Sequence, residues 1–85
     1  MRERAGERAA KYLETTSKSL RVFKKRNSES PVPSHRLDYV LDLARSYTRD
    51  ARHYLGDQKP VTSLACIAYA EGLLDALKFL ELAEF

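Results

Sequence analysis

The spacing of apolar residues in the first third of the chain predicts a helix over residues 3–26. These residues lie three, four or seven positions apart, the period of one helical face: Ala5, Ala9, Tyr12, Leu13, Leu20 and Phe23. The helix is expected to end at a loop over residues 27–34, because Pro31, Pro33 and short polar side chains disfavour helix and favour turns.

Two further helices are predicted, over residues 35–55 and 58–83. The first of them carries apolar and small residues at heptad-like spacing: Leu37, Leu41, Ala44, Thr48, Ala51 and Leu55. The second is apolar along most of its length.

Residues at the predicted helix ends fit these bounds. Ser34 is suited to cap the first N–H groups of helix 35–55, and Gly56 to take the left-handed conformation just past its end. Asp57 is expected to cap the next helix, with Pro60 in its first turn, where a missing N–H costs little. Because this connection is short, the helices it joins are expected to be antiparallel. The pattern therefore predicts an all-α fold, an up-down-up antiparallel three-helix bundle in one domain.

Composition agrees with this fold and excludes several classes of protein. The 85 residues are 44% hydrophobic and 32% charged, which is too apolar for a disordered chain, and three Gly and three Pro argue against a sandwich or barrel. The single Cys66 cannot form an internal disulfide and no leader-like segment begins the chain, so a cytoplasmic location is expected. The charge-free apolar run Leu64–Ala70 is far shorter than the ~20 residues of a membrane span, so no membrane association is expected.

The segment 61–85 is unusual because 17 of its 25 residues are apolar. A helix in a three-helix monomer needs only a stripe that faces two neighbours. Side chains on the side that also bears Glu71 and Lys78 are expected to be uncovered and to form a self-association surface or a groove for a protein partner: Leu64, Ile67, Leu74 and Leu82. The alternative is close helix packing through small residues, with modest exposure: Ala65, Ala68, Ala70, Gly72 and Ala76.

The net charge of +3 is unevenly distributed along the chain. Residues 1–27 carry +6, residues 28–56 are neutral and residues 57–85 carry −3. Basic residues crowd the end of the first predicted helix, where they could bind nucleic-acid phosphates: Lys18, Arg21, Lys24, Lys25 and Arg26. The alternative needs no ligand, because cations at a helix C-terminus are favoured by its partial negative charge.

Glu71 and Asp75 lie four residues apart, so both carboxylates are expected to project from one helical face, next to Tyr69 and opposite the close-packing Gly72. If buried, the pair could bind a divalent cation, share a proton or receive an arginine from the second helix. The alternative is a solvated or salt-bridged edge.

Other charged positions give weaker indications. Asp50 and His53 have the spacing found in di-iron four-helix bundles, but a single pair does not complete a ligand set. One polar face of the second helix is interpreted as solvated, its arginines neutralising its aspartates: Asp38, Asp42, Arg45, Arg49 and Arg52. No phosphate-binding loop, cysteine cluster or nucleophile–base pair occurs, so neither a catalytic residue nor a cofactor is predicted.

Two stretches resemble a known family. They are the Gly-Asp turn of Tyr54–Asp57 and, within Ser63–Leu77, the run Tyr-Ala-x-Gly-x-Leu-Asp-Ala. Over about residues 5–80 the chain resembles the archaeal domain-of-unknown-function family numbered 357. The resemblance implies a small cytoplasmic helical bundle with no assigned activity, and it transfers no catalytic residue. It also directs attention to the signature positions and the carboxylate between them: Tyr69, Glu71, Gly72 and Asp75.

Three functional hypotheses follow. The first is a non-enzymatic protein-interaction or self-associating module that uses the predicted helix 58–83. The second is RNA or DNA binding by the basic helix 3–26. The third is a metal-dependent activity at Glu71 and Asp75, with His53 as a further ligand.

Overall fold

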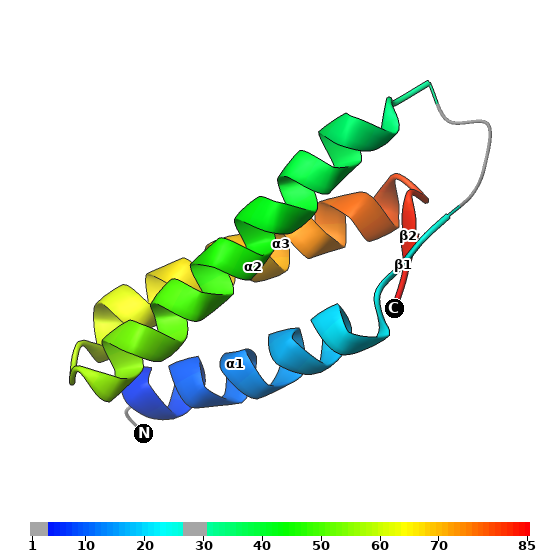
Figure 1. Cartoon of the computed structure of the whole chain (residues 1–85). Helices are drawn as coiled ribbons and strands as arrows, with labels where there is room; N and C mark the ends of the chain where they lie inside the picture. The colour runs from blue at the N-terminus through cyan, green and yellow to red at the C-terminus, as the bar shows by residue number, and fades with distance from the viewer. Residues whose placement is uncertain (1–3, 27–30) are drawn as a thin grey trace.

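Three helices and a two-stranded sheet make up the computed structural model, which describes residues 4–26 and 31–85 (Figure 1). The elements follow in the order α1 (Ala5–Val22), β1 (Lys24–Lys25), α2 (Ser34–Gly56), α3 (Pro60–Phe79) and β2 (Ala83–Glu84). Consecutive helices run in opposite directions and pack on one another, which confirms the predicted all-α three-helix bundle. The predicted helix start at residue 3 and residues 27–30 of the predicted loop lie outside the described residues.

The turn between α2 and α3 is built around Gln58, which has a left-handed backbone with φ 58°. The Lys59 N–H donates to the Tyr54 carbonyl at 2.8 Å, and the Gln58 N–H donates to the Leu55 carbonyl at 3.3 Å. These two hydrogen bonds form a Schellman motif, which satisfies carbonyls at the end of α2. The short connection holds α2 and α3 as an antiparallel pair.

Several predicted capping roles are wrong. Gly56 is the last residue of α2 rather than its left-handed terminator, and Asp57 is the C-cap of α2 rather than the N-cap of α3. Ser34 is the first residue of α2, and its hydroxyl accepts a hydrogen bond from Lys25 Nζ at 3.1 Å. Pro60 does begin α3, where its missing N–H costs little.

α1 ends at Val22, before the predicted end at residue 26. The next residue, Phe23, has an extended backbone with φ −62° and ψ 132°, and its ring stacks on that of Phe85 with 5.8 Å between centroids. β1 then pairs with β2 in antiparallel register, with Lys24 opposite Glu84. Packing against the C-terminal segment thus replaces the last predicted turn of α1.

α3 ends at Phe79 rather than at residue 83. Glu81 has a left-handed backbone with φ 59°, and the Leu82 N–H donates to the Leu77 carbonyl at 2.8 Å, which forms a second Schellman motif. The motif reverses the chain direction, so that Ala83 reaches β1 and is buried there.

Small side chains occupy much of the core and allow the helices to approach closely. Four alanines have no exposed surface: Ala9, Ala44, Ala51 and Ala70. The larger buried apolar side chains fill the space between them: Leu13, Leu37, Leu41, Ile67, Leu74 and Leu77. α3 packs on both other helices, and its contact with α2 is the more extensive.

A buried hydrogen bond joins α3 to α2: the Ser63 hydroxyl donates to the Ala51 carbonyl at 2.6 Å, and Ser63 has no exposed surface. Ser63→Ala is expected to lower the free energy of unfolding by about 1 kcal/mol, because one buried hydrogen bond is lost. Urea denaturation followed by circular dichroism measures the change. The matched control is Ser19→Ala, whose exposed hydroxyl donates within α1 and whose effect should stay below about 0.5 kcal/mol. Equal effects of the two variants would contradict a stabilising cross-helix bond.

Candidate functional site

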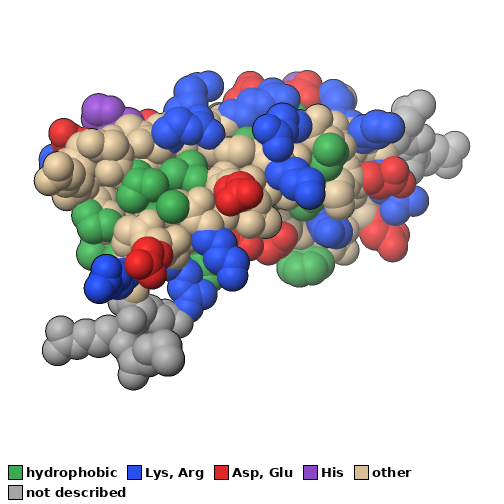
Figure 2. Space-filling view, turned by 90° about the horizontal axis from the view of Figure 1, so that it is seen from below, with side chains coloured by type: hydrophobic (Ala, Val, Ile, Leu, Met, Phe, Trp, Pro, Cys, Tyr) green, Lys and Arg blue, Asp and Glu red, His purple; other side chains and the backbone are tan. Residues whose placement is uncertain are grey.

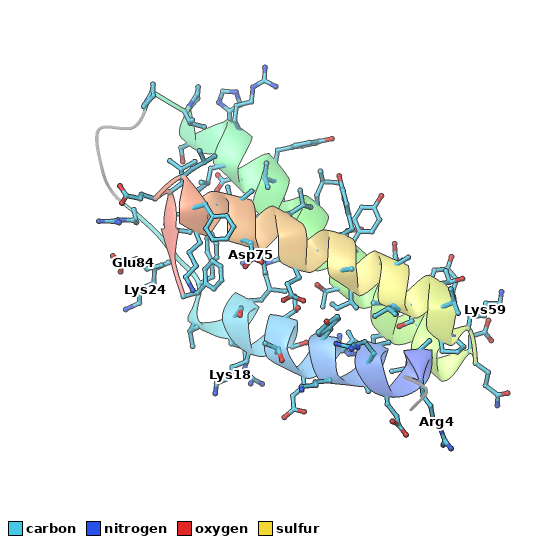
Figure 3. All side chains as sticks on the ribbon, turned by 180° about the vertical axis from the view of Figure 1, so that it is seen from behind. Arg4, Lys18, Lys24, Lys59, Asp75 and Glu84 are labelled. Carbon is cyan, nitrogen blue, oxygen red and sulfur yellow. The ribbon has the colours of Figure 1, made fainter. Side chains whose placement is uncertain are left out.

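A polar cleft of about 230 Å³ lies between α1 and α3 and gathers the two carboxylates of α3. It is lined by Thr15, Thr16, Ser19, Glu71, Leu74, Asp75, Lys78 and Phe85. Figure 3 shows Asp75 on the side of α3 that faces α1. We call this feature the acidic cleft.

Burial raises the pKa of Glu71 above its ordinary value, and the nearby Asp75 carboxylate raises it further. In the described part of the chain neither carboxylate has an ion-pair partner, so the predicted arginine from the second helix does not reach them. The Lys78 ammonium lies instead over the Phe85 ring, 4.8 Å from its centroid. The pair is therefore partly desolvated and uncompensated, a state intermediate between the two predicted alternatives.

The three signature residues and Glu71, which were predicted to form one functional face, do not share one face. Glu71 and Asp75 line the acidic cleft, whereas the Tyr69 ring packs edge-on against Tyr47 of α2 at 4.5 Å between centroids. Gly72 is exposed, and no described atom outside its own helical turn lies within 4 Å of the position where a Cβ would stand.

The predicted metal-ligand set is not assembled. No group of three or more His, Cys, Asp or Glu side chains suited to a metal ion occurs among residues 4–26 and 31–85. His53, a candidate further ligand, is exposed and its ring contacts that of Tyr54 at 5.2 Å between centroids. The acidic cleft thus offers two carboxylates and three hydroxyls, a set of weak, hard oxygen donors.

The predicted interface residues of α3 are mostly covered. Ile67 and Leu74 are 0% and 2% exposed, so the expectation that they lie on an uncovered side is wrong. Leu64 and Leu82 are half-buried and pack against core clusters. The reason is that α1 and α2 together cover the side of α3 on which these residues stand.

The opposite side of α3 is uncovered, and an apolar row runs along it beside the exposed Thr62 and Tyr69. The residues of this row recur three or four positions apart and are all exposed, and we call them the back of α3: Val61, Ala65, Ala68, Gly72, Ala76 and Phe79. Val61 is 72% exposed and Phe79 80% exposed. The large number of apolar residues in α3 indicated that some of them would be uncovered. The side of the helix predicted to be uncovered was the wrong one.

α3 is also long and apolar enough to cross a membrane, judged by length and composition alone. The expectation of no membrane association rested on the short charge-free run Leu64–Ala70. α3 meets the length-and-composition criterion in spite of Glu71 and Asp75. Core helices of soluble proteins pass the same test, and Ile67 and Leu74 of α3 are buried within the bundle.

The predicted basic cluster is dispersed by the early end of α1. Lys25 forms an ion pair with Asp38 at 2.9 Å, and Arg26 lies 3.7 Å from a Glu84 carboxylate oxygen. Lys24 belongs to β1, not to a helix end. The predicted cations therefore do not stand together at the end of α1.

A different basic surface forms where α1 meets α2. An open groove of about 280 Å³ there is lined by Ser17, Leu20, Arg21, Arg45, Thr48, Arg49 and Arg52. We call it the arginine groove. The α2 arginines were interpreted as a solvated face, and only the packing of α1 beside α2 joins them to Arg21.

The buried hydroxyl of Thr16 lines the acidic cleft and has no hydrogen-bond partner among the described residues. Thr16→Val is expected to raise the free energy of unfolding by about 1 kcal/mol, because it removes an unsatisfied polar group and conserves shape. Urea denaturation measures the change. The control is Thr15→Val, since the exposed Thr15 hydroxyl donates to the Lys11 carbonyl at 3.0 Å and its loss should change stability by less than about 0.5 kcal/mol. A loss of stability in Thr16→Val would show that the hydroxyl is satisfied.

The raised pKa of Glu71 predicts that its ionised carboxylate lowers the free energy of unfolding at neutral pH. A carboxyl whose folded-state pKa is raised stabilises the fold fully below its unfolded pKa, and this contribution is lost as pH rises through the folded pKa. Glu71→Gln should therefore be more stable than the unmodified chain at neutral pH, by up to about 0.5 kcal/mol on the scale of surface substitutions. The difference should vanish at acid pH. Thermal unfolding across pH measures it, with Glu14→Gln on the exposed side of α1 as control; a difference that persists at acid pH would contradict the electrostatic cause.

Comparison with known families gives one match. A family model described as "Protein of unknown function (DUF357)" matches residues 10–83, which confirms the resemblance indicated by the turn before α3 and the motif within it. Comparison with curated proteins and with solved structures gives no match.

Proposed function

The chain belongs to the DUF357 family, and for this member of a family without an assigned function we propose a non-enzymatic role: association with a second copy of itself through the back of α3. The observation that carries the proposal is the exposed apolar face described above. A helix on the surface of a globular protein presents charged and polar residues to water on that side. Here the central line of the exposed side carries no polar side chain from Val61 to Phe79.

Gly72 provides a second argument. Glycine in a helix interior costs about 1 kcal/mol relative to alanine. Among the described residues nothing outside the local turn of α3 requires it, because a Cβ at this position would meet no such atom within 4 Å. The close approach of another helix gives a reason for the missing side chain, since small residues allow helix backbones to come near each other.

The arrangement of residue sizes favours an identical copy as the partner. The smallest residues, Ala68 and Gly72, stand at the middle of the back of α3, and the large Val61 and Phe79 stand near its two ends. An antiparallel second copy related by a two-fold axis near Ala70 would place Val61 opposite Phe79 and Ala68 opposite Gly72. Such a self-complementary surface is what an isologous dimer needs.

The test uses Ala68→Glu, which places a carboxylate at the centre of the proposed interface. The unmodified chain is expected to have twice the 9.7 kDa mass of one chain, measured by light scattering on a sizing column. Ala68→Glu should weaken association by about 100-fold or more, because an uncompensated buried charge costs about 3–5 kcal/mol. Helicity should be unchanged, since Ala68 is exposed within one chain.

The matched control is Ala10→Glu, the same change at an exposed alanine of α1, and it should leave the dimer intact. Gly72→Ala supplies an independent readout: it should stabilise the isolated chain by about 1 kcal/mol and weaken the dimer. Monomeric mass for the unmodified chain would overturn the proposal. If that monomer also floated with phospholipid vesicles, the back of α3 would be assigned to a lipid surface instead.

The other two hypotheses receive less support in their original form. Of the five cations predicted for nucleic-acid binding, Lys24 and Lys25 lie in β1 rather than at the end of α1, and Lys25 and Arg26 are paired with carboxylates. The metal hypothesis is left with Glu71 and Asp75 alone. Self-association therefore accounts best for the largest departure from an ordinary soluble surface.

A further inference from the structure

The arginine groove concentrates positive charge between α1 and α2. Of the seven residues that line it, four are arginines and none is a carboxylate. Seen from below, Lys and Arg side chains are spread over much of the surface, with several along the upper part of the view (Figure 2). The lining contains no residue of α3, so the arginine groove is separate from the back of α3.

The guanidinium groups are spread along the groove. Arg45, Arg49 and Arg52 are four and three residues apart on one side of α2, and the distance from first to last corresponds to about 10 Å of helix. Arg21 extends from α1 on the opposite wall. The site therefore presents a short line of cations and not a single point.

Much of the donor capacity of these arginines is unused. Arg52 donates one hydrogen bond to the Ser17 hydroxyl at 2.9 Å, and Arg45 lies 3.6 Å from an Asp42 carboxylate oxygen. Arg21 and Arg49 have no hydrogen-bond or ion-pair partner within the described residues. A guanidinium carries five N–H donors in a planar fork that matches phosphate oxygens. Four such groups around one groove repel one another unless an anion lies between them.

We propose that the arginine groove binds the phosphodiester backbone of single-stranded nucleic acid. The line of arginines favours a chain of phosphates over one isolated phosphate, since guanidinium groups spread along about 10 Å of helix cannot all contact a single phosphate group. The lining has no aromatic side chain on which bases could stack. Binding through this groove is therefore independent of base sequence and depends strongly on salt.

The test is fluorescence anisotropy of a labelled oligo-uridine RNA and of an oligo-thymidine DNA of equal length. With four phosphate contacts on a single strand, affinity is expected to fall by about 50-fold between about 50 and 200 mM salt. Arg21→Gln/Arg49→Gln removes the two unpartnered arginines, so the same salt increase should then weaken binding by only about 7-fold. Equal binding of RNA and DNA supports contact with phosphates alone, and tighter binding of RNA supports added contact with the 2′-hydroxyl.

The matched control is Lys18→Gln/Lys24→Gln, which removes the same charge at exposed positions outside the groove lining (Figure 3). This control should keep the salt dependence of the unmodified chain. The proposal is overturned if neither oligonucleotide binds, if both double variants lose affinity equally, or if a duplex or inorganic polyphosphate binds more tightly than the single strands. Repeating the titration with Ala68→Glu separates this proposal from self-association, because the arginine groove lies within one chain.

Discussion

Close approach between α2 and α3 is the constraint on which the other features depend. Ala44, Ala51 and Ala70 have no exposed surface, and the Ser63 hydroxyl reaches the Ala51 carbonyl across the helix pair at 2.6 Å. Small side chains at the contact permit this spacing, since large ones would hold the helix axes apart. Because α2 and α3 lie close together, their contact buries only part of the surface of α3. The rest of this apolar helix consequently faces α1 or water.

This packing produces three chemically different surfaces. Two lie between neighbouring helices, and the third is the side of α3 that no helix covers. The acidic cleft lies between α1 and α3, the arginine groove lies between α1 and α2, and the back of α3 contacts neither neighbour. Glu71 and Asp75 thus lie on one side of α1, and the four arginines of the arginine groove lie on another.

The sequence predicts the number, type and order of the helices well, because the helical spacing of apolar residues and the prolines between helices are local features of the chain. It predicts poorly which side of α3 faces the core, since a helix that is apolar on all sides has no distinct apolar stripe to indicate that side. Ile67 and Leu74 were therefore placed on the uncovered side. The left-handed residue after α2 was misassigned to Gly56 and the end of α3 was missed, because Gln58 and Glu81 take the left-handed conformation that glycine usually marks. The arginine groove depends on which helix lies beside α2, and Arg21 is far from Arg49 in sequence. Glu71 and Asp75 were paired correctly because four-residue spacing fixes a shared face.

The pairing of β1 with β2 has a consequence for the order in which the fold forms. The α2–α3 pair is joined by a short turn, so its contacts are local and close with little entropic cost. Lys24 and Glu84, in contrast, meet only after the intervening chain has been folded back, and Phe23 and Phe85 stack at the same place. Closing a contact between such distant residues costs more chain entropy than closing the short turn. We therefore expect the α2–α3 hairpin to form before α1 docks on it and before β1 pairs with β2.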